Sequence, residues 1–81
     1  MRSLLSLLEA PIGKRVYVQH LTSYPDVCVR LRELGFCDNA MVRCLARNSD
    51  RLICEVCNTR IGLNTAVASK IFVSKFDRSI Q

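Results

Sequence analysis

The feature that most constrains the fold is a single helical signature set between segments that alternate like β-strands. Pro25 suits the first turn of a helix, where its missing N–H leaves no hydrogen bond unmade. Ser23 precedes Asp26 by three residues, which is the spacing of a capping box with Asp in place of the usual Glu. These residues predict one helix over about residues 24–34.

The same signature predicts how this helix packs and where it ends. Val27, Leu31 and Leu34 fall at i, i+4 and i+7, which predicts a buried apolar stripe. Gly35 follows at the position where a left-handed residue is favoured. Phe36 is then expected to fold back onto the helix end.

Short alternating segments flank the helix and predict a small curled sheet. In the first, Val16, Val18 and His20 are expected on one face. In the next two, the residues expected on the inner side are Val42, Cys44 and Ala46, and Leu52, Cys54 and Val56. Asn39 can adopt a positive φ in the turn after the helix, and Asn58-Thr59 is expected to form a hairpin turn. The expected strands cover residues 14–21, 40–47, 51–57, 60–63 and 71–73.

The length and composition favour a small binding or regulatory module. With 81 residues, 49% of them hydrophobic, the chain allows one domain, residues 1–81, with a modest core over about 7–73 and a less ordered tail at 74–81. The sequence offers no Ser-His-Asp set, no paired-carboxylate site and no glycine-rich phosphate loop. It therefore predicts no enzyme.

The charge fits an anionic partner only weakly. Twelve Lys and Arg stand against seven Asp and Glu, a net charge of +5. The basic residues are scattered along the chain, and no run of them exceeds two. A solubilising surface therefore explains them better than a nucleic-acid site does.

The five cysteines raise the question of a metal site. Cys54 and Cys57 form a CxxC pair, with His20 as the sole histidine. Residues i and i+3 of a strand point to opposite faces, so packing is the expected role of Cys54, and of Cys28 and Cys44. The leucine-rich start is too short for a secretory segment or a membrane span, which predicts a cytoplasmic protein with reduced thiols. A zinc or iron site at Cys54, Cys57 and His20 stays an alternative, although no cofactor is expected.

One predicted strand face mixes apolar and cationic side chains. Met41, Arg43, Leu45 and Arg47 alternate with apolar residues and are expected to share this face. It could bind a partner protein or, less well, RNA, because aromatic stacking residues are scarce on it. The competing interpretation is that the N-terminal segment Leu4–Leu8 covers the face.

The order of these elements resembles the FeoA family, to which ferrous iron transport protein A belongs. Residues 30–36, RLRELGF, with the strand at 41–47, resemble the family's RLxELGl-xxGxxV signature. LLEAPIG at 7–13 is similar to the family's opening, and residues 61–73 are similar to its LxxxxAxxIxV close. The matched positions include Leu31, Leu34, Gly35 and Phe36. The resemblance covers roughly residues 7–73.

The chain departs from this family in three turns. Asn39 and Asn58 stand where the family usually has Gly, and Asn is the next-best residue for a positive φ. The loop Asn48-Ser49-Asp50 is shorter and more polar than the family's proline-containing loop. If that loop docks the family's partner, the docking mode could differ here.

The resemblance implies a mostly β fold, a small five-stranded SH3-like barrel with one inserted helix. It further implies a non-catalytic accessory protein of bacterial ferrous iron uptake that binds the cytosolic domain of the FeoB-type GTP-dependent transporter. Metal sensing through the cysteines and RNA binding stay as alternatives. Open sheet edges would also allow a homodimer.

Overall fold

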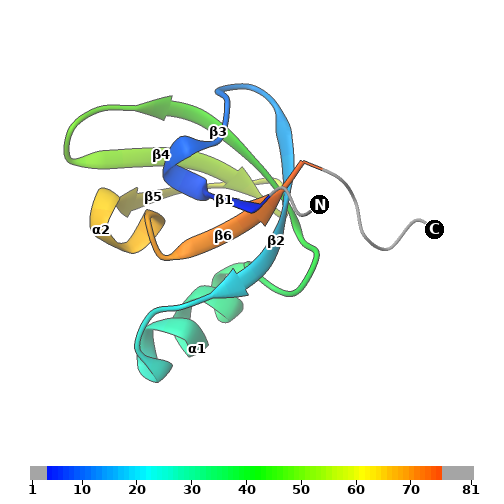
Figure 1. Ribbon diagram of the computed structural model, residues 1–81, viewed down its shortest axis with the longest axis vertical. Helices are drawn as coiled ribbons and strands as arrows, with labels where there is room; N and C mark the ends of the chain where they lie inside the picture. The colour runs from blue at the N-terminus through cyan, green and yellow to red at the C-terminus, as the bar shows by residue number, and fades with distance from the viewer. Residues whose placement is uncertain (1–3, 76–81) are drawn as a thin grey trace.

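Six strands form one antiparallel sheet in the order β1-β6-β2-β3-β4-β5 (Figure 1). The computed structural model describes residues 4–75, so most of the tail predicted at 74–81 lies outside the described residues. The elements are β1 (Leu4–Ser6), the 3₁₀ turn η1 (Leu7–Glu9), β2 (Arg15–Leu21), α1 (Pro25–Leu34), β3 (Met41–Arg47), β4 (Arg51–Val56), β5 (Thr59–Asn64), α2 (Thr65–Ala68) and β6 (Ile71–Ser74).

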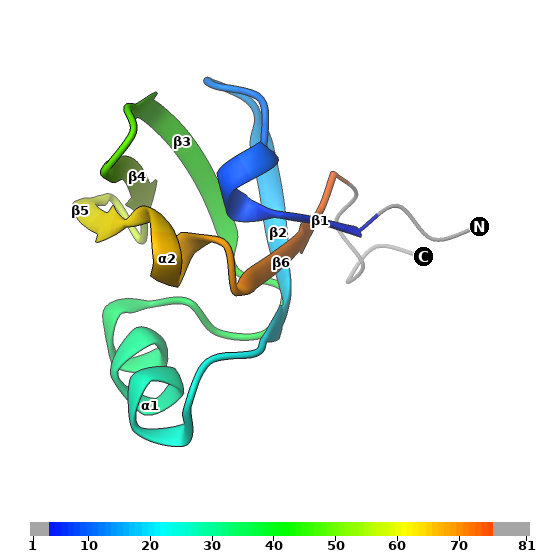
Figure 2. The same ribbon diagram turned by 60° about the vertical axis from the view of Figure 1, so that its left-hand side comes forward.

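The mostly β architecture with one long inserted helix agrees with the sequence prediction, but there are six strands instead of five. The additional strand is β1, whose Leu4 and Leu5 pair with Ser74 and Val73 of β6. The sheet curls around its inner face and leaves β1 and β5 as its two edges (Figure 2). No helix within residues 4–75 is long and apolar enough to cross a membrane.

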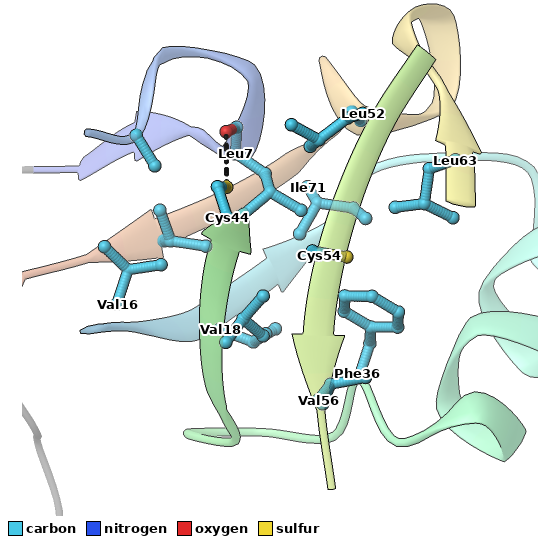
Figure 3. Close-up of a cluster of buried hydrophobic side chains, with 14 of the residues drawn as sticks. Leu7, Val16, Val18, Phe36, Cys44, Leu52, Cys54, Val56, Leu63 and Ile71 are labelled. Carbon is cyan, nitrogen blue, oxygen red and sulfur yellow. Dashed lines mark hydrogen bonds between the residues drawn. The ribbon is translucent and has the colours of Figure 1, made fainter. Parts of the chain in front are cut away.

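The core lies on the inner face of the curled sheet (Figure 3). The predicted inward residues of β2, β3 and β4 are buried there, together with Leu7, Phe36 and Ile71. The Cys44 thiol donates a hydrogen bond to the Leu7 carbonyl at 3.6 Å, which ties η1 to the middle of β3. The inward strand residues are Val16, Val18, Val42, Cys44, Leu52, Cys54 and Val56.

Helix α1 begins without the predicted capping box. Tyr24 is the N-cap, and its side chain makes no capping hydrogen bond. Pro25 explains this, because a proline disfavours helical backbone in the preceding residue, and Tyr24 is extended at φ −58° and ψ 152°. Ser23 therefore lies one residue too early to cap the helix.

The buried stripe of α1 also differs from the prediction at one position. Leu31 and Cys28 are buried and Val27 is half-buried, but Leu34 remains 42% exposed. Gly35 ends the helix in the left-handed region at φ 116°, as expected. Phe36 folds back as predicted, is fully buried, and donates its N–H to the Leu31 carbonyl at 3.0 Å.

Two register shifts interrupt the predicted alternation. Between Val18 and His20 the pairing with β6 skips Gln19, so His20 lies opposite half-buried Phe72 rather than on the inner face. The expectation that His20 shares a face with Val16 and Val18 is therefore wrong. A second shift interrupts the pairing of β3 with β4 at Leu45.

The β4–β5 hairpin turns one residue earlier than predicted. Its two central residues are Cys57 at φ 54° and Asn58 at φ 60°, which is the pattern of a type I′ turn. The positive φ expected of Asn58 is confirmed, and so is that of Asn39 at 62°. Strand β4 therefore ends at Val56, and Cys57 belongs to the turn.

Candidate protein-binding site

The outer side of β3 and β4 carries the mixed apolar and charged surface that the sequence predicts in part. We define the outer face by the following residues: Met41, Arg43, Leu45, Ile53 and Glu55. Met41 is 47% exposed, and the other four side chains are half-buried. The apolar side chains of this face are thus accessible from solvent within the described part of the chain.

The register shift in β3 sets which side chains belong to the outer face. Cys44 pairs with Cys54, but Ala46 pairs with Ile53, so Leu45 is the additional residue. In such a bulge two residues of one strand lie opposite a single residue of the other. Leu45 and Ala46 are therefore both opposite Ile53. The apolar part of the outer face is therefore continuous from β3 to β4.

Arg47 does not belong to the outer face, contrary to the prediction. Beyond the bulge it pairs with Leu52, an inward residue. Its Nη1 donates hydrogen bonds to the carbonyls of Leu8 at 2.6 Å and Ala10 at 3.1 Å. Arg47 thus anchors the N-terminal segment to β3, and the structure brings together only Met41, Arg43 and Leu45 of the predicted four.

The same contacts show where the N-terminal leucines lie. Leu7 is fully buried in the core, and β1 pairs with the edge of β6. The N-terminal segment therefore packs on the inner side of β3, so the interpretation that Leu4–Leu8 covers the outer face is wrong.

A row of charged side chains crosses the outer side of the sheet. Arg43 Nη2 lies 2.8 Å from Glu55 Oε1 in an ion pair whose two side chains are both partly exposed. Cross-strand pairing places Arg15 beside Arg43 and Arg60 beside Glu55. An exposed pair of this kind contributes at most about 1 kcal/mol to stability. Its larger effect is to neutralise Arg43, which weakens any role of that residue in attracting an acidic partner.

The three predicted metal ligands are not brought to one point. Cys54 faces the core and donates its thiol to the Ile61 carbonyl at 3.6 Å, whereas Cys57 is exposed in the hairpin turn. His20 is exposed on β2, which β3 separates from β4. Within residues 4–75, no group of three or more His, Cys, Asp or Glu side chains could hold a metal ion.

The environment of Cys54 also opposes metal binding through its sulfur. Burial raises the pKa of Cys54 to about 12, and the neighbouring Cys44 thiol adds to this effect. Burial raises the pKa of Cys44 as well, although the Arg47 guanidinium partly offsets the increase. Because the thiolate is the metal ligand, both groups are poor ligands near neutral pH.

A groove that the sequence analysis missed lies between the start of α1 and α2. It has a volume of about 540 Å³, and its lining includes Tyr24, Val27, Val67 and Lys70. Tyr24 is 80% exposed at its rim. Residues 22–27 and 64–70 form this groove together, and no sequence pattern indicates that these two segments meet.

The fold and these surfaces define a class of protein, a small SH3-like β domain with one inserted helix and exposed apolar and charged surfaces. Residues 5–75 match the model of the FeoA domain, so the chain belongs to the FeoA family, a family of small accessory domains linked to ferrous iron transport. No curated protein matches the chain.

Solved structures agree with this assignment. The FeoA of Stenotrophomonas maltophilia, a procaryotic SH3 domain protein solved with zinc, is 30% identical to this chain in sequence. The two structures superpose with a TM-score of 0.73, over 86% of this chain and 89% of the other. The FeoA protein of Chlorobium tepidum is 24% identical with a TM-score of 0.80, over 86% and 69% of the two chains. A manganese-dependent transcriptional repressor shares the fold at 16% identity and a TM-score of 0.83, over 94% of this chain but 44% of its own.

Proposed function

We propose that this protein is a non-catalytic cytoplasmic accessory protein of ferrous iron uptake that binds the cytosolic domain of a FeoB-type transporter. Membership of the FeoA family supports the link to iron transport. In this proposal the protein modulates the transporter by binding, and it needs no cofactor of its own.

The observation that carries the docking surface is the exposure of Met41 beside other apolar residues of the outer face. Leu45 and Ile53 continue the apolar surface across two strands, and the Arg43–Glu55 pair lies next to them. Apolar side chains surrounded by polar ones are typical of the centre of a protein–protein interface. Association would remove Met41, Leu45 and Ile53 from water, and this burial would supply the affinity.

The test is a binding assay between the full chain and the purified cytosolic domain of the transporter. Met41→Asp and Leu45→Asp place a charge at the centre of the outer face, and we expect each to weaken binding about thirty-fold, as for a central interface residue. Both positions are accessible to solvent, so the variants should fold, which circular dichroism verifies.

Val67→Asp is the matched control, since it places the same charge in the groove between α1 and α2. We expect it to leave the affinity unchanged. Full binding by Met41→Asp together with loss of binding by Val67→Asp would transfer the docking site to the groove. Absence of binding by the wild-type chain would contradict the proposed partner itself.

A further inference from the structure

The turn between η1 and β2 presents an aliphatic side chain to solvent at one end of the molecule. Ile12 is 45% exposed, and Gly13 follows it at φ 82° with no atom near the position a Cβ would occupy. The turn is rigidly held, because the Lys14 N–H donates to the Pro11 carbonyl at 3.3 Å and the Gly13 N–H donates to the Cys44 carbonyl at 2.7 Å. This turn lies at the end of the molecule opposite α1 (Figure 2).

Three cations surround the base of this turn. Lys14 precedes β2, Arg15 is the first residue of β2, and Lys75 directly follows β6, so the fold brings together positions far apart in sequence. With Pro11 they line a shallow pocket of about 300 Å³. In the described part of the chain the one ion pair joins Arg43 and Glu55, and it includes none of these three cations.

We propose that this tip, defined by Ile12, Lys14, Arg15 and Lys75, binds an anionic lipid surface. The three cations would contact lipid phosphates, with one phosphate seated in the pocket, while Ile12 enters the boundary between headgroups and acyl chains. Attraction of basic residues to anionic lipid and burial of a small apolar area are the two contributions that hold peripheral proteins on membranes.

The position of Ile12 favours lipid over the other anionic partners. A single-stranded RNA site would present an aromatic ring for stacking on the bases, whereas this tip presents an aliphatic side chain. An acidic protein segment would use the cations but gains little from one isolated aliphatic residue on a turn. With the tip on a membrane, α1 and its groove would point away from the lipid.

The experiment measures co-sedimentation of the full chain with vesicles of phosphatidylcholine containing phosphatidylglycerol, against vesicles of phosphatidylcholine alone. We expect binding to the anionic vesicles only, weakening as salt is added. Lys14→Gln with Arg15→Gln should reduce the partition coefficient about thirty-fold, since each cation at an anionic surface contributes about five-fold. Ile12→Ser should reduce it about ten-fold without changing the net charge.

Arg30→Gln with Arg32→Gln is the matched control, because it removes the same two charges from exposed positions on α1, at the other end of the molecule. The partition coefficient of this variant should stay within about two-fold of the wild-type value, which is the effect expected of the lower net charge alone. Equal losses in the two double variants would show attraction by net charge alone and overturn the proposal.

Binding assays with single-stranded RNA and with the cytosolic domain of the transporter complete the test. Binding to poly(U) that needs Lys14 and Arg15 but tolerates Ile12→Ser, with no vesicle binding, would overturn the proposal in favour of RNA. The lipid site does not depend on the proposed transporter partner, because Met41→Asp should leave vesicle binding intact and Ile12→Ser should leave transporter binding intact.

Discussion

The inner and outer faces of β3 and β4 come from alternate residues of the same two strands, yet they differ in almost every physical respect. On the inner face, Val42, Leu52 and Cys54 are at most 1% exposed, whereas Met41 on the outer face is 47% exposed. The outer face also holds the Arg43–Glu55 ion pair, whereas the buried side chains of β3 and β4 on the inner face are all apolar side chains or thiols. The difference indicates that the inner face supplies most of the stability and that the outer face contributes little to it.

The test with the largest expected effect compares alanine substitutions at two adjacent residues of β4. Leu52→Ala removes a fully buried side chain from the core and should lower the free energy of unfolding by about 3 kcal/mol. Ile53→Ala, on the outer face, should lower it by less than about 1 kcal/mol, because its side chain is half-buried. Urea titrations followed by circular dichroism measure both, and equal losses would refute the assignment of stability to the inner face.

A smaller difference in the free energy of unfolding is expected between substitutions of the two arginines of β3. Arg47→Met removes charge-assisted hydrogen bonds to the carbonyls of Leu8 and Ala10, and should lower the free energy of unfolding by about 1.5 kcal/mol. Arg43→Met breaks a partly exposed ion pair and should lower the free energy of unfolding by at most about 1 kcal/mol. The same titrations give both values, and the reverse order would mean that Arg47 does not anchor the N-terminal segment.

The third test compares how fast the five cysteine thiols react. The substitution that it uses should leave the free energy of unfolding almost unchanged. Ellman's reagent at pH 8 should label two thiols rapidly, the exposed Cys37 and Cys57, and all five only in denaturant. Cys54 should stay protected, because it is buried and its pKa of about 12 keeps it protonated at this pH. Cys57→Ala should lower the rapid count to one, and a count that stays at two would show that Cys57 is not accessible.

The sequence predicted both faces of the strands up to the bulges, and the inward assignments of His20 and Ala46 failed beyond them. The inward residues Val16, Val18, Val42, Cys44, Leu52, Cys54 and Val56 follow from period-two alternation, which is a local property of a strand. On the outer face, alternation placed Met41, Arg43 and Leu45 correctly but failed at Arg47, because a bulge comes after Cys44. Nothing in the residues around Leu45 marks this bulge.

The helix shows the same division between local and tertiary causes. Its end at Gly35 and the insertion of Phe36 were predictable, since a left-handed backbone at that position favours glycine. The buried side of α1 was predicted correctly at Leu31, Val27 and Cys28 but not at Leu34, which is 42% exposed. Periodicity identifies an apolar face, but the orientation of that face depends on the rest of the fold.

The sequence by itself determined the order of the predicted elements, the one long helix, the positive φ of Asn39 and Asn58, and the inward side of each central strand up to its bulge. These properties depend on steric and hydrophobic preferences within a few residues. Only the tertiary structure decided the pairing of β1 with β6, the two bulges, the separation of His20 from the cysteines, and the meeting of Lys75 with Lys14 and Arg15. Each of these depends on contacts between segments far apart in the chain, and the geometry of those contacts is fixed only when the sheet curls around its core.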